Sequence, residues 1–417
     1  MKRLSLAFVV CAILFCSIDF ARGQAWTQTR APITNWTSIA SSANGSKLVA
    51  VAGQKRYDVQ VGPIYFSTNF GTTWLQADAP ITNWTSVAIS ADGTKVVAAA
   101  NGTGIYTSPD GGANWTPTTA PVAPWYAIAS SADGSMLLAA VGGIGFPYGP
   151  SAAGPVFISS DSGANWSDAG LPTHTWSSVG VSADGSSLMA ASPGGGGVDV
   201  IFSSTNSGAT WIARSFPLPY LFSITTCADG TSSLAVQFDW VHYQLNHNGS
   251  RIYSSTDNGA LWEEIGSLGP APVFLAASAD GRQWVAANQG GPGENAGGIS
   301  ISRDSGINWL ATAAPMTNWS SVASSADGNR LVAAVNGGGI WISETTSMPR
   351  LNLSRRGTNL LVAWLLPSTD FGLEEKADLN ATNWMEVTSA PALNLNHLQN
   401  QVTLPQPVGN RFYRLRH

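Results

Sequence analysis

One pattern recurs seven times along this chain of 417 residues, with a period of roughly 47 residues. Most copies begin Ala-Pro-x-x-x-Trp, continue with an apolar run, an Ala-Asp-Gly triplet and a second apolar run, and end in Ser-x-Asp-x-Gly-x-x-Trp. The first run starts at Trp36, Trp84, Trp125, Trp176, Leu221, Pro272 and Trp319. The Asp or Asn of the triplet follows eight positions later in every copy, at Asn44, Asp92, Asp133, Asp184, Asp229, Asp280 and Asp327. Units of this length stack on one another to bury a shared core, so a repeat fold is predicted.

The repeat predicts strands and not helices. Asp-Gly between two short apolar runs is a strong hairpin signal, and we expect a type I′ turn with two residues of positive φ. Each copy then supplies four strands; in the second copy these are expected at 85–90, 95–100, 104–108 and 115–119. Apolar and small polar residues alternate along them, as in sheets stacked face to face.

The second marker of the repeat is the eight-residue Ser-x-Asp-x-Gly-x-x-Trp segment. Its Asp or Asn stands at Asn69, Asp110, Asp161, Asn206, Asp257 and Asp304. These six copies resemble the Asp-box, or BNR, repeat of sialidase-like propellers of the secreted bacterial type. In physical terms the Asp caps its own turn, the Gly takes the left-handed conformation and the Trp packs into the sheet, so we expect a structural role for all six.

The two ends of the repeat array complement each other. The seventh copy ends at Ile340–Glu344 without a box Trp, whereas Trp26 precedes Trp36 by the same ten residues that separate Trp74 from Trp84. We therefore expect the segment 26–30 to close the last unit, which removes open sheet edges. The predicted fold is all-β: a seven-bladed β-propeller with four-stranded blades.

The repeat stops near Met348, and a second unit is expected from 348 to 417. Six short runs without helical period read as strands, at 351–353, 360–364, 371–374, 384–387, 401–404 and 412–415. On this pattern the segment resembles the small Ig-like or fibronectin-like sandwiches of secreted bacterial proteins. Residues 410–414 match an ordinary last strand better than a sorting signal.

The N-terminus has the features of a secretory signal peptide. Lys2 and Arg3 precede an apolar run over 4–15, and Ala21-Arg22-Gly23 offers a small-x-small cleavage site. Residues 1–23 are therefore expected to be removed, leaving a propeller over 24–347 in a secreted protein, extracellular or periplasmic. Cys11 and Cys16 would leave with the signal, so Cys227 remains alone and no disulfide is expected.

Composition excludes several kinds of partner. Charged residues are 11% of the chain, the formal net charge is −5, and the repeats contain no basic cluster, which argues against nucleic acid and anionic membranes. We expect a monomer that uses no cofactor and does not insert into a membrane after signal cleavage.

Loop length points to the functional face. The Asp-Gly and Asp-box turns share one face of such a ring and hardly vary, whereas the loops between the second and third strands range from four residues to the long segment 237–250. Variable loops on a rigid scaffold are where binding specificity usually lies. The candidate ligand-binding residues are Arg56, Tyr57, Tyr148, Phe238, Trp240, His242 and Tyr243. Aromatic side chains among polar ones suit sugar rings or extended peptides, although 238–243 could instead fold its own loop down.

Two other patterns in the sequence could indicate a metal site and a glycosylation site. His242 and His247 lie near Asp239, but a third metal ligand is missing from the loop, so no metal site is predicted. The repeated Asn-Trp-Thr/Ser at Asn35, Asn83, Asn114, Asn165 and Asn318 matches a glycosylation acceptor, but its fixed place in the repeat favours a role in blade geometry.

Three functions compete. A sialidase-type enzyme needs several arginines around a carboxylate, and only Arg56 falls on the variable face. A xyloglucanase-like glycoside hydrolase needs two carboxylates, and its candidates are Asp58, Asp199, Asp239 and Glu294. A non-catalytic propeller, resembling the photosystem-assembly and sortilin-like members of the repeat class, needs only a closed ring and a varied face. We predict this third function, with an extracellular glycan or protein as the ligand.

Overall fold

Every regular element of the protein is a β-strand in the computed structural model. The structure describes residues 24–53, 60–143, 153–193, 199–216, 220–238, 250–268, 273–290, 297–345, 351–365, 371–378, 383–394, 397–405 and 411–416. Within these residues the expected all-β class is confirmed, because they contain no helix. It follows that no described helix could cross a membrane.

The repeat region folds into antiparallel sheets whose strands follow chain order. One eight-stranded sheet joins the first copy to the last through β2 and β27. It contains β1 (Thr27–Gln28), β2 (Thr34–Ser41), β3 (Leu48–Ala52), β4 (Ile64–Ser67), β5 (Leu75–Gln76), β26 (Trp319–Ser324), β27 (Arg330–Gly338) and β28 (Ile340–Glu344). The other five sheets have four strands each.

These five sheets correspond to the second to sixth copies. The second copy forms β6 (Trp84–Ile89), β7 (Val96–Ala100), β8 (Gly104–Ser108) and β9 (Thr116–Pro117). The third forms β10 (Trp125–Ser130), β11 (Leu137–Val141), β12 (Val156–Ser159) and β13 (Ser167–Asp168). The fourth forms β14 (Ser178–Val181), β15 (Leu188–Ser192), β16 (Val200–Ser204) and β17 (Ile212–Ser215). The fifth forms β18 (Leu221–Thr226), β19 (Ser233–Phe238), β20 (Ser250–Ser255) and β21 (Glu263–Ser267). The sixth forms β22 (Val273–Ala277), β23 (Trp284–Asn288), β24 (Ile299–Ser302) and β25 (Leu310–Ala311).

The core lies between neighbouring sheets. All five residues of β7 are buried, since both faces of this strand meet another sheet. Two valines are followed there by three alanines, and the small side chains let the sheets approach closely. Trp84 fills the gap between the first two copies and packs edge-on against Tyr106.

The chain closes on itself as expected from Trp26. Strand β1 pairs antiparallel with β28, with Thr27 opposite Ile342. The Trp26 ring lies 6.2 Å from that of Trp319, and its indole nitrogen donates to the Thr312 hydroxyl. The first residues of the described chain therefore complete the sheet of the last copy.

A closed circle of backbone hydrogen bonds links the seven Ala-Asp-Gly turns. The N–H of each turn alanine donates to the carbonyl of the next turn alanine, over 2.7–3.0 Å, and Ala326 donates back to Ala43. The members of this alanine belt are Ala43, Ala91, Ala132, Ala183, Ala228, Ala279 and Ala326. The inner ends of all seven copies therefore meet around one axis.

The Ala-Asp-Gly turns are not the expected type I′ hairpins. Only the glycine has positive φ, as at Gly93 with 68°, and the preceding Asp92 does not. The reason is a side-chain bridge: the Asp92 carboxylate accepts from the Ser90 hydroxyl and the Thr94 N–H, and the Ser90 hydroxyl accepts from the Lys95 N–H. These bonds complete a longer turn, so a second left-handed residue is not needed.

The C-terminal segment forms two sheets that share one core. The first contains β29 (Asn352–Arg356), β30 (Asn359–Leu365), β34 (Gln399–Leu404) and β33 (Ala392–Asn394); the second contains β32 (Met385–Glu386), β31 (Gly372–Lys376) and β35 (Phe412–Arg416). Trp364 from the first sheet packs with Leu373 and Leu415 from the second. Strand β33, which the sequence did not predict, is mostly exposed and lacks an apolar pattern.

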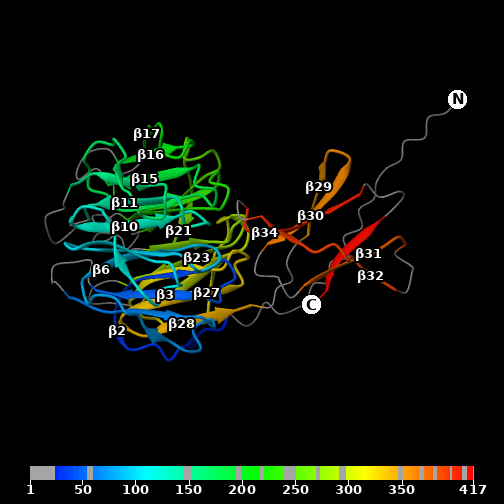
Figure 1. Cartoon of the computed structure of the whole chain (residues 1–417), viewed down its shortest axis with the longest axis horizontal. Coiled ribbons are helices and arrows are strands. Elements are labelled where there is room, and N and C mark those ends of the chain that lie inside the picture. The colour runs from blue at the N-terminus through cyan, green and yellow to red at the C-terminus, as the bar shows by residue number, and fades with distance from the viewer. Residues whose placement is uncertain are drawn as a thin grey trace.

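These C-terminal sheets contact the ring at the alanine belt. Leu365, at the end of β30, and Leu398, in the turn before β34, pack against a cluster that includes Ala43, Ala279 and Ala326. Figure 1 shows β34 as the part of the C-terminal sheets nearest to the ring.

Candidate functional site

The ring has two unlike faces. On the turn face, the Ala-Asp-Gly turn of each copy bonds to the box turn of the same copy, as when the Gly111 N–H donates to the Thr94 carbonyl. On the opposite face, which we call the loop face, the loop after the second strand bonds to the segment that enters the first strand, as when the Asn101 N–H donates to the Asn83 carbonyl. Each face therefore has its own set of connections.

The box residues of the turn face bond to their own turn. The Asp110 carboxylate accepts from the Ser108 hydroxyl, the backbone N–H groups of Ala113 and Asn114, and the Asn114 side chain. Burial alone would raise the pKa of Asp110, but the hydrogen bonds from Asn114, Ser108 and Ala113 together lower it to about 2. This geometry is the one expected for a structural carboxylate.

In five of the six boxes the residue four positions after the box Asp or Asn pairs with its side chain. At Asp110, Asp161 and Asp304 the partner is an Asn whose amide donates to the carboxylate, whereas Asp257 is followed by Leu261 and receives only its backbone N–H. Where it is Asn, as at Asn69, its own amide donates to the hydroxyl of Thr73. The Asn-Trp-Thr/Ser segments at Asn114 and Asn165 therefore contain these partners, in line with a role in blade geometry.

The backbone of the box also departs from a simple turn. The glycine is left-handed, as expected, with φ of 72° at Gly71, and the residue before it is left-handed too, with φ of 51° at Phe70. The same pair recurs at Ser162, Ser207, Asn258 and Ser305 with the glycines that follow them. The left-handed conformation of Phe70 is tolerated because the Ser67 hydroxyl accepts a hydrogen bond from the Gly71 N–H and so holds the turn.

Most of the predicted loop-face residues lie outside the described part of the chain. These are Arg56, Tyr57, Asp58, Tyr148, Asp239, Trp240, His242, Tyr243, His247 and Glu294. Only Asp199 and Phe238 can be placed. Among described residues, no group of three or more His, Cys, Asp or Glu side chains is arranged to hold a metal ion.

The two placed residues support the backbone. Asp199 is 1% exposed; its carboxylate accepts the Leu221 N–H and its carbonyl accepts the Phe216 N–H. Phe238 is the last residue of β19, is also buried, and donates its N–H to the Tyr220 carbonyl. Both residues tie a loop to the neighbouring connection, which favours structural roles for them over contact with a ligand.

Exposed aliphatic side chains on the loop face are a feature that the sequence analysis missed. They occupy the position after Ala-Pro in four connections that follow one another around the ring, and they are Met316 (63% exposed), Ile33 (74%), Ile81 (54%) and Val122 (74%). Val61 adds to them, since the Gly62 N–H beside it donates to the Thr82 carbonyl next to Ile81. We call these five residues the apolar arc. The signal was available, because a surface position of a repeat rarely keeps an aliphatic residue without a contact.

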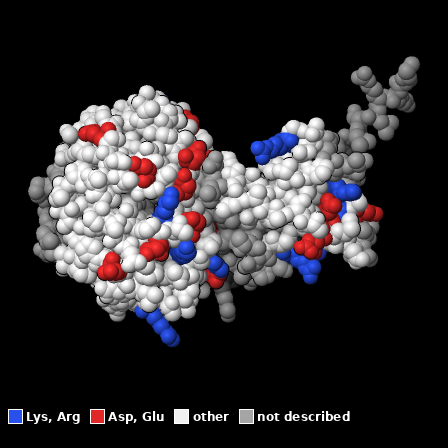
Figure 2. Space-filling view, viewed as in Figure 1, with Lys and Arg blue, Asp and Glu red and all other residues white. Residues whose placement is uncertain are grey.

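The charge of the ring is concentrated away from the arc. The four connections that hold it, 31–36, 79–84, 120–125 and 314–319, contain no charged residue. In the view of Figure 2 most charged side chains of the ring lie in the half nearer the C-terminal sheets. Four of the five arc residues therefore stand on connections without a charge of their own.

The turn face holds a different feature, an axial cavity of about 180 Å³. It is lined by the alanine belt and by small side chains such as Ser131, Ser278 and Cys227, with Leu398 at one wall. The Cys227 thiol donates to the Asp229 carboxylate at 2.8 Å, and burial with this contact raises the pKa of the thiol to about 11. Cys227 occupies the place that serine holds in the other six copies.

Comparison with solved structures identifies the architecture. No protein-family model matches the chain, and no curated protein sequence matches it significantly. YCF48 from Cyanidioschyzon merolae matches with a TM-score of 0.54 at 13% identity, covering 77% of this chain and 98% of that one. The chain has a β-propeller fold.

Two other propellers match equally well. Kuenenia stuttgartiensis hydrazine synthase gives a TM-score of 0.57 at 13% identity, covering 77% of this chain and 97% of that one. An ancestral GH74 enzyme gives 0.57 at 14% identity, covering 82% of this chain and 53% of that one. YCF48 is also known bound to the D1 peptide, and that structure covers 79% of this chain and 97% of its own, with a TM-score of 0.55 at 14% identity. At these identities the likeness is one of fold.

Proposed function

We propose that this propeller is a secreted, non-catalytic binding protein that recognises a segment of another extracellular protein through its loop face. The proposal includes seven Asp-box blades, a signal peptide over 1–23, and a small C-terminal sandwich from 348 to 417. The single observation that carries it is the apolar arc on four successive connections.

The chemistry of the arc favours a protein over a glycan. Sugar rings bind through stacking on aromatic faces and through hydrogen bonds to polar groups. The arc instead offers five aliphatic side chains, four of them on connections without a charged residue. Such a surface gains free energy by covering apolar side chains of a polypeptide. The YCF48 complex with the D1 peptide supports the idea that a propeller of this shape can hold a peptide.

The C-terminal sheets leave this face free. Leu365 and Leu398 contact the alanine belt, on the face opposite to the arc. A partner on the loop face therefore meets only the connections and loops of the ring. This arrangement suits a protein whose recognition surface is presented outward.

The alternative of a glycoside hydrolase has weaker support. Hydrolysis needs two carboxylates beside the substrate. Of the four candidates, Asp199 is buried and accepts a backbone N–H, so it is not available to a sugar. The remaining candidates, Asp58, Asp239 and Glu294, lie outside the described residues.

The test is binding to an array of extracellular protein segments and glycans, with the double variant Ile33→Asp/Ile81→Asp. Charges at the centre of the arc should weaken binding to peptide ligands at least about tenfold, because each would be buried against apolar groups. The matched control is Leu75→Asp/Leu310→Asp, which alters two exposed leucines on the outer strands β5 and β25. The control should bind as the unmodified protein does.

Two results would contradict the proposal. Equal loss of binding in the arc variant and the control would show that the arc is not the contact surface. Turnover of xyloglucan or aryl glycosides, abolished by Asp239→Asn, would establish the hydrolase instead.

A further inference from the structure

The axial cavity on the turn face is lined in part by a side chain from the C-terminal sheets. Leu398 belongs both to the lining of the cavity and to the apolar cluster with the belt alanines Ala43, Ala279 and Ala326. It stands in the short turn that leads into β34 and is half-buried. A branched apolar side chain thus sits where seven blades leave a gap.

The backbone at Leu398 is held in an unfavourable conformation. Its φ is 50°, in the left-handed region that non-glycine residues avoid. A leucine in this region is strained, and such strain persists when contacts elsewhere impose it. The contact that Leu398 makes is the belt, so the strain and the packing point to the same role.

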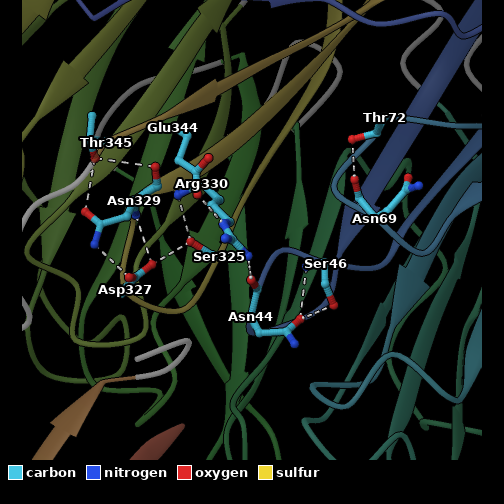
Figure 3. Close-up of polar contacts among 10 residues, drawn as sticks. All are labelled: Asn44, Ser46, Asn69, Thr72, Ser325, Asp327, Asn329, Arg330, Glu344 and Thr345. Atoms are coloured by element: carbon cyan, nitrogen blue, oxygen red, sulfur yellow. Dashed lines mark hydrogen bonds and ion pairs between the residues drawn. The ribbon is translucent and has the colours of Figure 1, made fainter. Parts of the chain in front are cut away.

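One further contact joins the C-terminal sheets to the same face, and a contact within the last copy holds its end in place. Leu365, at the end of β30, joins the cluster around the belt. Where the other copies have a box turn, the seventh has Thr345, whose N–H donates to the Asn329 carbonyl and whose hydroxyl bonds to the Asn329 side chain. Figure 3 shows this contact. It also shows the two hydrogen bonds that the Asp327 carboxylate accepts, from the Asn329 amide and from the Ser325 hydroxyl.

The surroundings of the Ala-Asp-Gly turn in the seventh copy differ from those of the equivalent turn in the second copy. Asp327 is buried and burial raises its pKa, whereas the pKa of the equivalent Asp92 is lowered. Arg330 adds a bond to the Asn44 carbonyl and an ion pair with Glu344 at 2.8 Å, joining the last copy to the first. These bonds hold the end of the last copy, up to Thr345, against its own turn.

We propose that the C-terminal sheets are a docked lid, in which Leu398 is the stopper that closes the axial cavity on the turn face. The cavity then admits solvent or ligand only from the loop face, and the belt is unavailable to other proteins. The alternative is a module that swings freely on a tether beyond Thr345. This inference stands independently of what the loop face binds.

Cys227 provides an internal reporter for the lid. Its thiol lines the cavity beside the stopper and is 3% exposed, so a reagent from the turn face must pass Leu398. In Leu398→Asp, the alkylation of Cys227, followed by mass spectrometry of its peptide, should be at least about tenfold faster, since the reagent gains access to the thiol. Small-angle scattering of the same full-length variant should show a larger radius of gyration.

The matched control is Leu393→Asp, at an exposed leucine of β33 in the same hairpin. It should keep the slow alkylation rate, and near-ultraviolet circular dichroism should show native packing in both variants. If Leu398→Asp does not fold, Leu398→Ala should give a smaller increase in the rate. An unchanged rate in a folded Leu398 variant, or fast alkylation of the unmodified protein, would overturn the proposal.

Discussion

The Asp box is, at the level of single residues, a matched set of donors and acceptors. Asp110 accepts four hydrogen bonds, and one of them comes from the side-chain amide of Asn114. Asn69 reverses the last bond by donating to Thr73. Five of the six boxes therefore keep a pairing of the two side chains although the residues differ, and the box at Asp257 does without it.

A double-mutant cycle tests this pairing. Asp110→Asn brings two amide donors together and should destabilise the protein by about 1 kcal/mol. Adding Asn114→Thr restores an acceptor, as in Asn69 and Thr73, and should recover most of that loss. The measurement is urea unfolding of the two single variants and the double variant at pH 7. Additive effects of the two changes would show that the side chains do not interact.

The strands and turns of the ring differ in how well the sequence predicts them. In the second copy, β8 begins and ends where the apolar pattern indicates, β6 is offset by one residue, and β7 begins one residue later than expected. The predicted type I′ turn was wrong, because the preference of the Asp-Gly dipeptide does not reveal the side-chain hydrogen bonds that join Ser90, Asp92 and Thr94. The prediction of the loop-face candidates rests on residue type. It does not hold for Phe238, which is buried, because residue type alone does not reveal which way a side chain points.

Strand β1 is the element on which closure depends most directly. Trp26→Ala removes the contact with Trp319 and the bond to Thr312, and should destabilise the protein by about 3 kcal/mol, as for other buried tryptophans. Differential scanning calorimetry measures the effect. The comparison is Thr27→Ala, an exposed position of the same strand, which should change stability little. Equal effects would mean that the indole is not what secures the closing strand.

The whole molecule combines a carboxylate-rich turn face with a loop face that carries the apolar arc on connections without a charged residue. Hydrogen bonds lower the pKa of most turn-face aspartates, including Asp92, Asp110, Asp133, Asp161, Asp184, Asp229, Asp257 and Asp304. Asp327, under the lid, is the exception, because burial raises its pKa.

These shifts set the acid sensitivity of the propeller. A carboxyl whose pKa is lower in the folded protein stabilises it fully above its unfolded pKa of about 3.9, and this contribution is lost as the pH falls through the folded pKa. For Asp110 that value is about 2. We therefore expect the melting temperature to vary little near neutral pH and to fall steeply below pH 4. The Asp110→Asn/Asn114→Thr double variant should show a shallower fall; a profile identical to that of the unmodified protein would contradict this origin.

The alanine belt has a consequence for the number of repeat copies that the fold can accept. Tandem repeats gain and lose copies by recombination, and blades of similar sequence should allow it. Here each belt N–H has a single carbonyl partner, and the circle of seven encloses a gap that one leucine lines in part. A chain with one blade more or fewer would reclose at another diameter, and Leu398 would no longer fit. On the proposed docking of the C-terminal sheets, these sheets therefore fit a ring with this number of copies and no other.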